Sequence, residues 1–216
     1  FLMKVRSLYH LEAMLDQDLA WRKREFTTIK FMIKNARQHE KVILYKSAVA
    51  LLYSHWEGYL KNSSQAYACY LNHVAPKYGE MKDNFLQSSL ADKFSQGFSF
   101  KKYPFQKEIF EYIKCATDMP LKINEKRVVD TESNLKSHVL FNIMKQLALD
   151  TNIFELKENF IDVIMVDNRN KIAHGEKIDS AEVEEAYSLL ESELLEMIMS
   201  FQSTIISSAA NKYYLK

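Results

Sequence analysis

The sequence contains few residues that favour turns. It holds 4 glycines and 3 prolines among 216 residues, and 47% of its residues are hydrophobic. So few turn-forming residues argue against the all-β classes, and so many hydrophobic residues argue against a disordered chain. We therefore expect an all-α protein.

Cysteine and long apolar runs are also scarce. Cys69 and Cys115 are neither close together nor numerous enough to form a disulfide framework, which predicts a reducing, cytoplasmic setting. No uninterrupted apolar run reaches the roughly 20 residues of a membrane span, and the start at Phe1 does not have the build of a signal peptide. We expect no membrane association.

Several familiar chemical motifs are missing as well. The sequence has no His-Glu-x-x-His or paired Cys-x-x-Cys pattern for zinc, no glycine-rich phosphate loop and no Gly-x-Ser-x-Gly nucleophile turn. We therefore expect neither a metal nor a nucleotide cofactor.

The charge is nearly balanced overall but unevenly placed. The formal net charge is +1, yet residues 21–41 carry seven basic and two acidic side chains, and residues 176–196 carry eight acidic and one basic. Solvated helix faces explain most such runs, and a basic surface facing an anionic partner is the alternative.

Apolar residues recur at three- and four-residue steps along most of the chain, which is typical of amphipathic helices. We expect one domain over residues 1–216, in which residues 78–130 form a less regular insertion.

Trp56 is interpreted as a core residue. Aromatic residues and lysines share the stretch 95–105, which we interpret as a loop packed on the core; stacking on unpaired bases is the alternative. The predicted helices cover residues 5–34, 40–74, 82–94, 106–117, 133–149, 155–174 and 180–208.

The segment 168–175, Asn-Arg-Asn-Lys-Ile-Ala-His-Gly, carries the most chemistry. Projected at about 100° per residue, Asn168 falls on the apolar stripe of its helix and should be buried. Asn170 and His174 are neighbours on another face, with Asp167 on the same stripe. Arg169 lies about 140° from His174 by the same projection, so one ideal helix does not aim both at one atom. Gly175 suits a left-handed residue that ends the helix.

Each of these residues also has an explanation that needs no function. A histidine is electrostatically favourable at any helix C-terminus, and Arg169 is in reach of Asp162 two turns back. Asp167 and Lys171 are spaced as an ordinary surface ion pair.

The spacing of Arg169 and His174 matches the R-x4–6-H motif of the HEPN domain superfamily, which the chain resembles. The stretches 18–25 (Asp-Leu-Ala-Trp-Arg-Lys-Arg-Glu) and 51–58 (Leu-Leu-Tyr-Ser-His-Trp-Glu-Gly) are similar to the Microcystis-type group of stand-alone HEPN proteins, found among bacterial defence and toxin–antitoxin genes. The resemblance implies an antiparallel helical bundle with additional helices and an irregular middle insertion.

The resemblance also implies a metal-independent endoribonuclease that acts through the ribose 2′-hydroxyl. His174 would be the acid/base, Arg169 the phosphate clamp and Asn170 its support. It further implies a homodimer with a composite site, an RNA substrate, and an antitoxin or defence-system partner. The alternative is a non-catalytic HEPN module that binds RNA, a nucleotide or a protein. Further candidates to line the cleft are His55, Glu57, Asp167 and Lys171, and Asn168 and Gly175 are expected to be structural supports.

Overall fold

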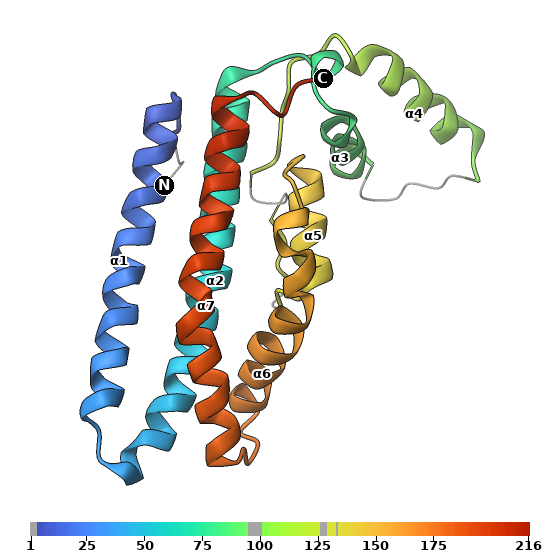
Figure 1. Cartoon of the computed structure of the whole chain (residues 1–216). Helices are drawn as coiled ribbons and strands as arrows, with labels where there is room; N and C mark the ends of the chain where they lie inside the picture. The colour runs from blue at the N-terminus through green and yellow to red at the C-terminus, as the bar shows by residue number, and fades with distance from the viewer. Residues whose placement is uncertain (1–3, 95–100, 126–128, 133) are drawn as a thin grey trace.

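Three long helices lie side by side in a computed structural model (Figure 1). The structure describes residues 4–94, 101–125, 129–132 and 134–216. Helix α1 (Leu8–Asn35) turns directly into the antiparallel helix α2 (Gln38–Val74). Helix α7 (Ser180–Ala210) packs along α2 and also contacts α1.

Local capping explains where these helices begin and end. The Ser7 side chain accepts a hydrogen bond from His10 N at 3.1 Å, and Asp179 accepts one from Ala181 N at 2.8 Å. Both satisfy backbone N–H groups that have no partner in the first turn of a helix. Helix α2 is followed by its C-cap residue Ala75, which takes a left-handed conformation directly before Pro76.

A further layer of helical segments packs against α2 and α7. It consists of α5 (Ser137–Gln146), the 3-10 helix η2 (Asn152–Lys157), the π-helical segment η3 (Phe160–Asp167) and the short helix α6 (Asn168–Ala173). Trp56 of α2 is fully buried in the core. Its ring packs edge to face against the ring of Phe154, with 5.7 Å between the ring centroids. The interpretation of Trp56 as a core residue is confirmed.

The remaining helices form a head at one end of the bundle. It contains η1 (Tyr78–Glu80), α3 (Asp83–Lys93) and α4 (Tyr103–Ala116), and α4 projects away from the long helices (Figure 1). The C-terminus is attached to the head, because Lys82 N donates to Tyr214 O and Lys216 N donates to Glu80 O, both at 3.0 Å.

The predicted all-α class is confirmed: the described residues contain helices and two isolated β-bridges but no strand. One prediction was wrong in detail, because residues 155–174 are not one α-helix but a 3-10, a π and an α segment in turn. The loop predicted over 95–105 ends earlier, since α4 already begins at Tyr103; residues 95–100 lie outside the described part.

No helix in the described part of the chain is long and apolar enough to cross a membrane.

Candidate functional site

The residues of the R-x4–6-H motif follow directly after the π-helical segment η3. Such segments have i→i+5 hydrogen bonds and are often found at functional sites. Asn168 is buried, at 7% exposure, and its side-chain amide donates to Ile164 O at 3.0 Å and to Val163 O at 3.3 Å. The predicted burial of Asn168 is confirmed, and its side chain bonds the backbone that the π geometry rearranges.

Gly175 ends α6, which carries the motif and which we call the motif helix. It takes a left-handed conformation, with φ +72°. Gly175 N donates to Ile172 O at 3.1 Å and Glu176 N donates to Lys171 O at 2.9 Å. This pair of hydrogen bonds is the Schellman arrangement of a helix C-terminus. The predicted role of Gly175 in ending the helix is confirmed.

Arg169 is half-buried and held by three partners from different parts of the chain. Its Nη1 donates to Asn170 Oδ1 at 2.7 Å and to Asn134 Oδ1 at 3.3 Å. Its Cζ lies 4.7 Å from the centroid of the Tyr53 ring. The guanidinium plane is therefore positioned by α2, by the segment before α5 and by its own neighbour Asn170.

Sequence spacing had placed Arg169 in reach of Asp162, but the Asp162 carboxylate bonds Ser137 instead. It accepts hydrogen bonds from Ser137 N at 2.6 Å and from Ser137 Oγ at 2.9 Å. The carboxylate thus caps the first turn of α5, where backbone N–H groups lack helical partners.

The residues that lead into α5 are fixed on α2 by two further hydrogen bonds. Leu135 N donates to the Tyr53 hydroxyl at 2.8 Å, and Thr131 Oγ1 donates to Glu57 Oε1 at 2.6 Å. Burial raises the pKa of Tyr53 to about 12, so the phenol remains protonated near neutral pH. Glu57 therefore supports the segment that carries Asn134, instead of standing free in a cleft.

The two other charged candidates form ion pairs that anchor the motif helix. Asp167 lies 3.4 Å from Lys136 Nζ, and Lys171 Nζ lies 2.6 Å from Glu182 Oε1 of α7. The surface pair expected between Asp167 and Lys171 is replaced by these two, which join α6 to its neighbours on both sides.

His174 is the C-cap residue of α6, and its side chain is exposed to solvent. Because α6 is α-helical from Asn168 to Ala173, the separation of about 140° between Arg169 and His174 still applies. Arg169 faces Tyr53 and Asn134, while His174 is accessible to a molecule that approaches from outside.

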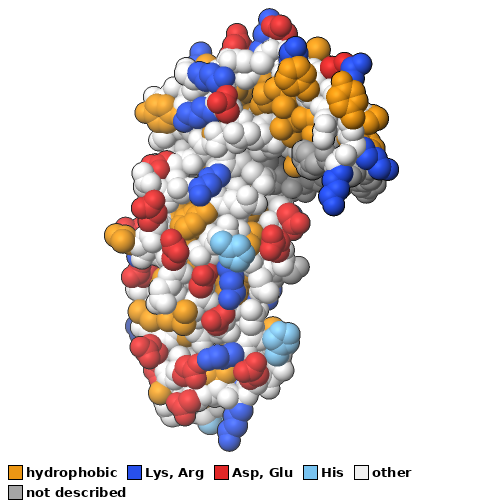
Figure 2. Space-filling model, turned by 90° about the vertical axis from the view of Figure 1, so that its right-hand side faces the viewer, with side chains coloured by type: hydrophobic (Ala, Val, Ile, Leu, Met, Phe, Trp, Pro, Cys, Tyr) orange, Lys and Arg blue, Asp and Glu red, His pale blue; other side chains and the backbone are white. Residues whose placement is uncertain are grey.

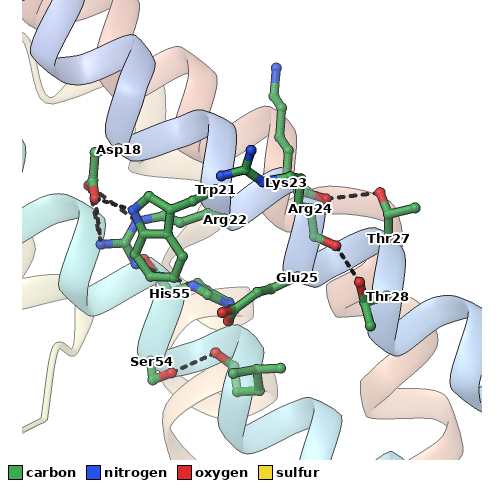
Figure 3. Close-up of polar contacts among 11 residues, drawn as sticks. Asp18, Trp21, Arg22, Lys23, Arg24, Glu25, Thr27, Thr28, Ser54 and His55 are labelled. Atoms are coloured by element: carbon green, nitrogen blue, oxygen red, sulfur yellow. Dashed lines mark hydrogen bonds and ion pairs between the residues drawn. The ribbon is translucent and has the colours of Figure 1, made fainter.

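His55 belongs to a different cluster, on the side of α2 that packs against α1 (Figure 3). Its Nδ1 lies 3.3 Å from Arg22 Nη1 and its Nε2 lies 3.0 Å from Glu25 Oε2. Arg22 has only donors, so Nδ1 accepts and Nε2 carries the proton that faces Glu25. Burial lowers the pKa of His55, as does the charge of Arg22, whereas Glu25 opposes them. The structure does not bring His55 together with Arg169.

Arg22, the centre of this cluster, is only 3% exposed. It forms a salt bridge to Asp18 at 3.1 Å and donates to His55 O at 3.0 Å. A Cβ atom at Gly58 would lie 3.2 Å from both terminal nitrogens of this guanidinium. Because Gly58 has no side chain, the Arg22 guanidinium has room to lie against α2 and link it to α1.

Comparison with models of known protein families identifies the family of the chain. The model of the RiboL-PSP-HEPN family matches residues 17–207. The chain belongs to this HEPN family. HEPN domains commonly cleave or bind RNA and often dimerise. The narrower likeness of this HEPN chain to the Microcystis-type group stays a prediction. The searches of curated proteins and of solved structures gave no match.

Three residues around Arg169 in the HEPN domain were not found from the sequence. Tyr53 and Asn134 contact the guanidinium, and Lys136 pairs with Asp167. Tyr53 lies within the stretch 51–58 that carries the family resemblance, which was a usable signal. Asn134 and Lys136 follow the weakly patterned middle of the chain, and no spacing rule connects them to Arg169 and Asp167, which lie more than 30 positions later.

Proposed function

We propose that this HEPN protein is a metal-independent endoribonuclease whose reacting groups are Arg169, Asn170 and His174. The observation that carries the proposal is the contrast between the first and last of these residues. The Arg169 guanidinium is fixed by Asn134, Asn170 and Tyr53, while His174 is exposed at a helix end five residues later. A fixed cation can stabilise the charge of a phosphodiester transition state, and an accessible imidazole can transfer the protons of the reaction.

In the proposed reaction the ribose 2′ oxygen attacks the neighbouring phosphorus. His174 takes the proton of the 2′-hydroxyl, the P–O5′ bond breaks, and the departing 5′ oxygen receives the proton from the imidazolium. The products are a 2′,3′-cyclic phosphate and a 5′-hydroxyl. Histidine suits both steps because it changes protonation near neutral pH.

Arg169 would bind the phosphate and stabilise the negative charge that grows in the transition state. A guanidinium already held in place needs no reorganisation during the reaction, which makes its contribution larger. Asn170 accepts from Arg169 Nη1 at 2.7 Å and would keep the fork oriented. Removal of a preorganised charge-stabilising donor typically costs about 100- to 1,000-fold in rate.

The test is RNA cleavage by purified protein in EDTA. We expect cleavage by the wild type and a loss of at least about 100-fold in both Arg169→Ala and His174→Ala. Matched controls are Arg24→Ala and His39→Ala, which remove an exposed arginine of α1 and an exposed histidine of α2. Absence of cleavage in the wild type, or survival in both site variants, would show that the mechanism is wrong.

We further propose that the active form is a homodimer in which Arg169 of one chain and His174 of the other act on one phosphate. The angle of about 140° between them supports this arrangement. Two exposed hydrophobic side chains on the segments that precede α6 also support it: Leu156 of η2 is 97% exposed and Val163 of η3 is 45% exposed, and a second chain would cover them.

The biological role that we propose is that of a toxin or anti-phage effector with a cognate antitoxin or defence-system partner. Expression of the wild type should then arrest growth, and His174→Ala should relieve the arrest. Arrest that persists in His174→Ala would favour the alternative, a HEPN module that acts by binding RNA, a nucleotide or a protein.

A further inference from the structure

Helix α4 has two faces of different character. Its inner face carries Phe105, Ile109, Tyr112 and Ala116, which are half-buried or buried. Tyr112 fixes this face to α3, because its hydroxyl donates to Ser89 Oγ at 3.1 Å. The inner face therefore accounts for the attachment of α4 to the rest of the head. The other face has no partner in the described part of the chain.

The outer face of α4 carries Tyr103, Lys107, Phe110 and Lys114, which we call the outer stripe. These residues are four, three and four positions apart, so their side chains lie within about 60° of one another around the helix. Tyr103 is 72% exposed, Phe110 is 58% exposed and the Lys107 side chain is 61% exposed. Aromatic rings and ammonium groups thus alternate along one exposed line.

The lysines lie close to the rings. Lys114 Nζ is 4.4 Å from the centroid of the Phe110 ring, and Lys107 occupies the turn between Tyr103 and Phe110. At about 1.5 Å of rise per residue, the two aromatic positions are separated by about 10 Å along the axis. An unpaired strand can place two of its bases at such a separation with a phosphate between them.

We propose that the outer stripe binds unpaired nucleotides of RNA. Bases stack on Tyr103 and Phe110, and Lys107 and Lys114 neutralise the phosphates beside them. Aromatic platforms combined with basic side chains are how proteins bind single strands without sequence preference. The choice of RNA over DNA rests on the proposed function, whereas the stacking surface itself rests on the outer stripe.

The pattern favours nucleotides over a lipid surface. A helix that lies in a membrane interface has a broad apolar face with its charges on the opposite side. On α4 Lys107 lies between the two aromatic rings and Lys114 lies beyond Phe110. Glu111 lies 3.7 Å from Lys107 beside the stripe. This carboxylate would repel RNA phosphates and anionic headgroups alike, so the distinction between the two ligands rests on the order of rings and lysines along the outer stripe.

The position of α4 suits a substrate arm. Helix α4 projects from one end of the bundle, on the same side as α5 and as α6, which lies nearer the other end (Figure 1). Figure 2 shows hydrophobic and basic side chains next to one another on this projecting part. RNA held on the outer stripe would therefore be tethered on the side of the molecule that carries the motif helix.

The test measures binding of a fluorescein-labelled, unstructured 12-nucleotide RNA by anisotropy. The protein carries His174→Ala, so that the RNA stays intact. Adding Tyr103→Ala and Phe110→Ala together should raise Kd at least about 25-fold, since each stacked base contributes about 1–3 kcal/mol. Tyr103→Phe keeps the ring and should bind like the parent. Tyr9→Ala, which removes an 80% exposed tyrosine of α1, is the matched control.

Unchanged RNA binding by the double variant would overturn the proposal. So would co-sedimentation with phosphatidylglycerol–phosphatidylcholine vesicles that is lost in the double variant while its RNA affinity stays the same. Both rings are exposed, so thermal unfolding should show equal stability for all variants. Failure of the ribonuclease proposal is separate: it would appear as wild-type protein that does not cleave RNA in EDTA, although the outer stripe still binds it.

Discussion

The guanidinium of Arg169 lies over the ring of Tyr53, with its Cζ 4.7 Å from the ring centroid. The same tyrosine accepts a hydrogen bond from Leu135 N at 2.8 Å. One side chain of α2 thus fixes both the arginine and the segment that presents Asn134 to it. The site depends on α2 as much as on the helix that carries the motif.

Tyr53→Phe should destabilise the protein by about 1–3 kcal/mol. The substitution keeps the ring under Arg169 but leaves the buried Leu135 N–H without its acceptor. Urea denaturation measures the effect, with Tyr9→Phe as the control because Tyr9 is 80% exposed. Equal unfolding free energies for Tyr53→Phe and the wild type would contradict this role of the hydroxyl.

Gly58→Ala should also destabilise the protein, by about 1–3 kcal/mol. Inside a helix this change usually stabilises by about 0.5–1 kcal/mol. Here the new Cβ would lie 3.2 Å from two nitrogens of Arg22, which is held by Asp18 and His55 and cannot move aside. In an Arg22→Met background the same change should be neutral or stabilising. Destabilisation of equal size in both backgrounds would mean that the clash is not with Arg22.

The stability of the protein should fall as the pH drops below the ordinary histidine pKa of about 6.5. The pKa of His55 is lowered in the folded state by burial and by Arg22. Between the two pKa values the unfolded chain binds a proton that the folded chain does not, so acid favours unfolding. Urea denaturation at pH 7.5 and 5.5 measures this effect.

His55→Gln should reduce this pH dependence, and His73→Gln, which changes an exposed histidine, should retain it. An NMR titration of the His55 ring gives the pKa directly. A value at or above 6.5 would contradict the account.

Gly175→Ala should cost about 1–2 kcal/mol of stability, because its φ of +72° is strained for a residue with a Cβ atom. A Cβ here meets no atom within 4 Å, so strain is the only cost. Gly175→Asn should cost less, since asparagine tolerates this conformation better. Chemical denaturation compares the two variants, and a cost for asparagine equal to that for alanine would argue against the strain.

Much of the fold follows from residue spacing. The long helices, the burial of Asn168 and the left-handed Gly175 all rest on local patterns that neighbouring residues determine. The π geometry of Phe160–Asp167 does not, because an apolar segment reads as a helix whether its hydrogen bonds span four residues or five.

The surroundings of Arg169 are harder to predict. The motif residues were named from a short pattern, but their partners come from elsewhere in the chain. Asn134 reaches Arg169 across 35 positions, and Tyr53 reaches it from α2. The ion pairs of Asp167 and Lys171 also join other segments, where helical spacing alone had suggested that they pair with each other.

The central claim is that Arg169 of one chain and His174 of another act on the same phosphodiester. The direct test is RNA cleavage in EDTA by an equimolar mixture of Arg169→Ala and His174→Ala proteins, after their subunits have exchanged. Each mixed dimer would contain one intact site. If subunits pair at random, about half the dimers are mixed and about a quarter of all sites are intact. We predict about a quarter of wild-type activity from two proteins that are inactive alone. A mixture as inactive as its components would contradict the claim.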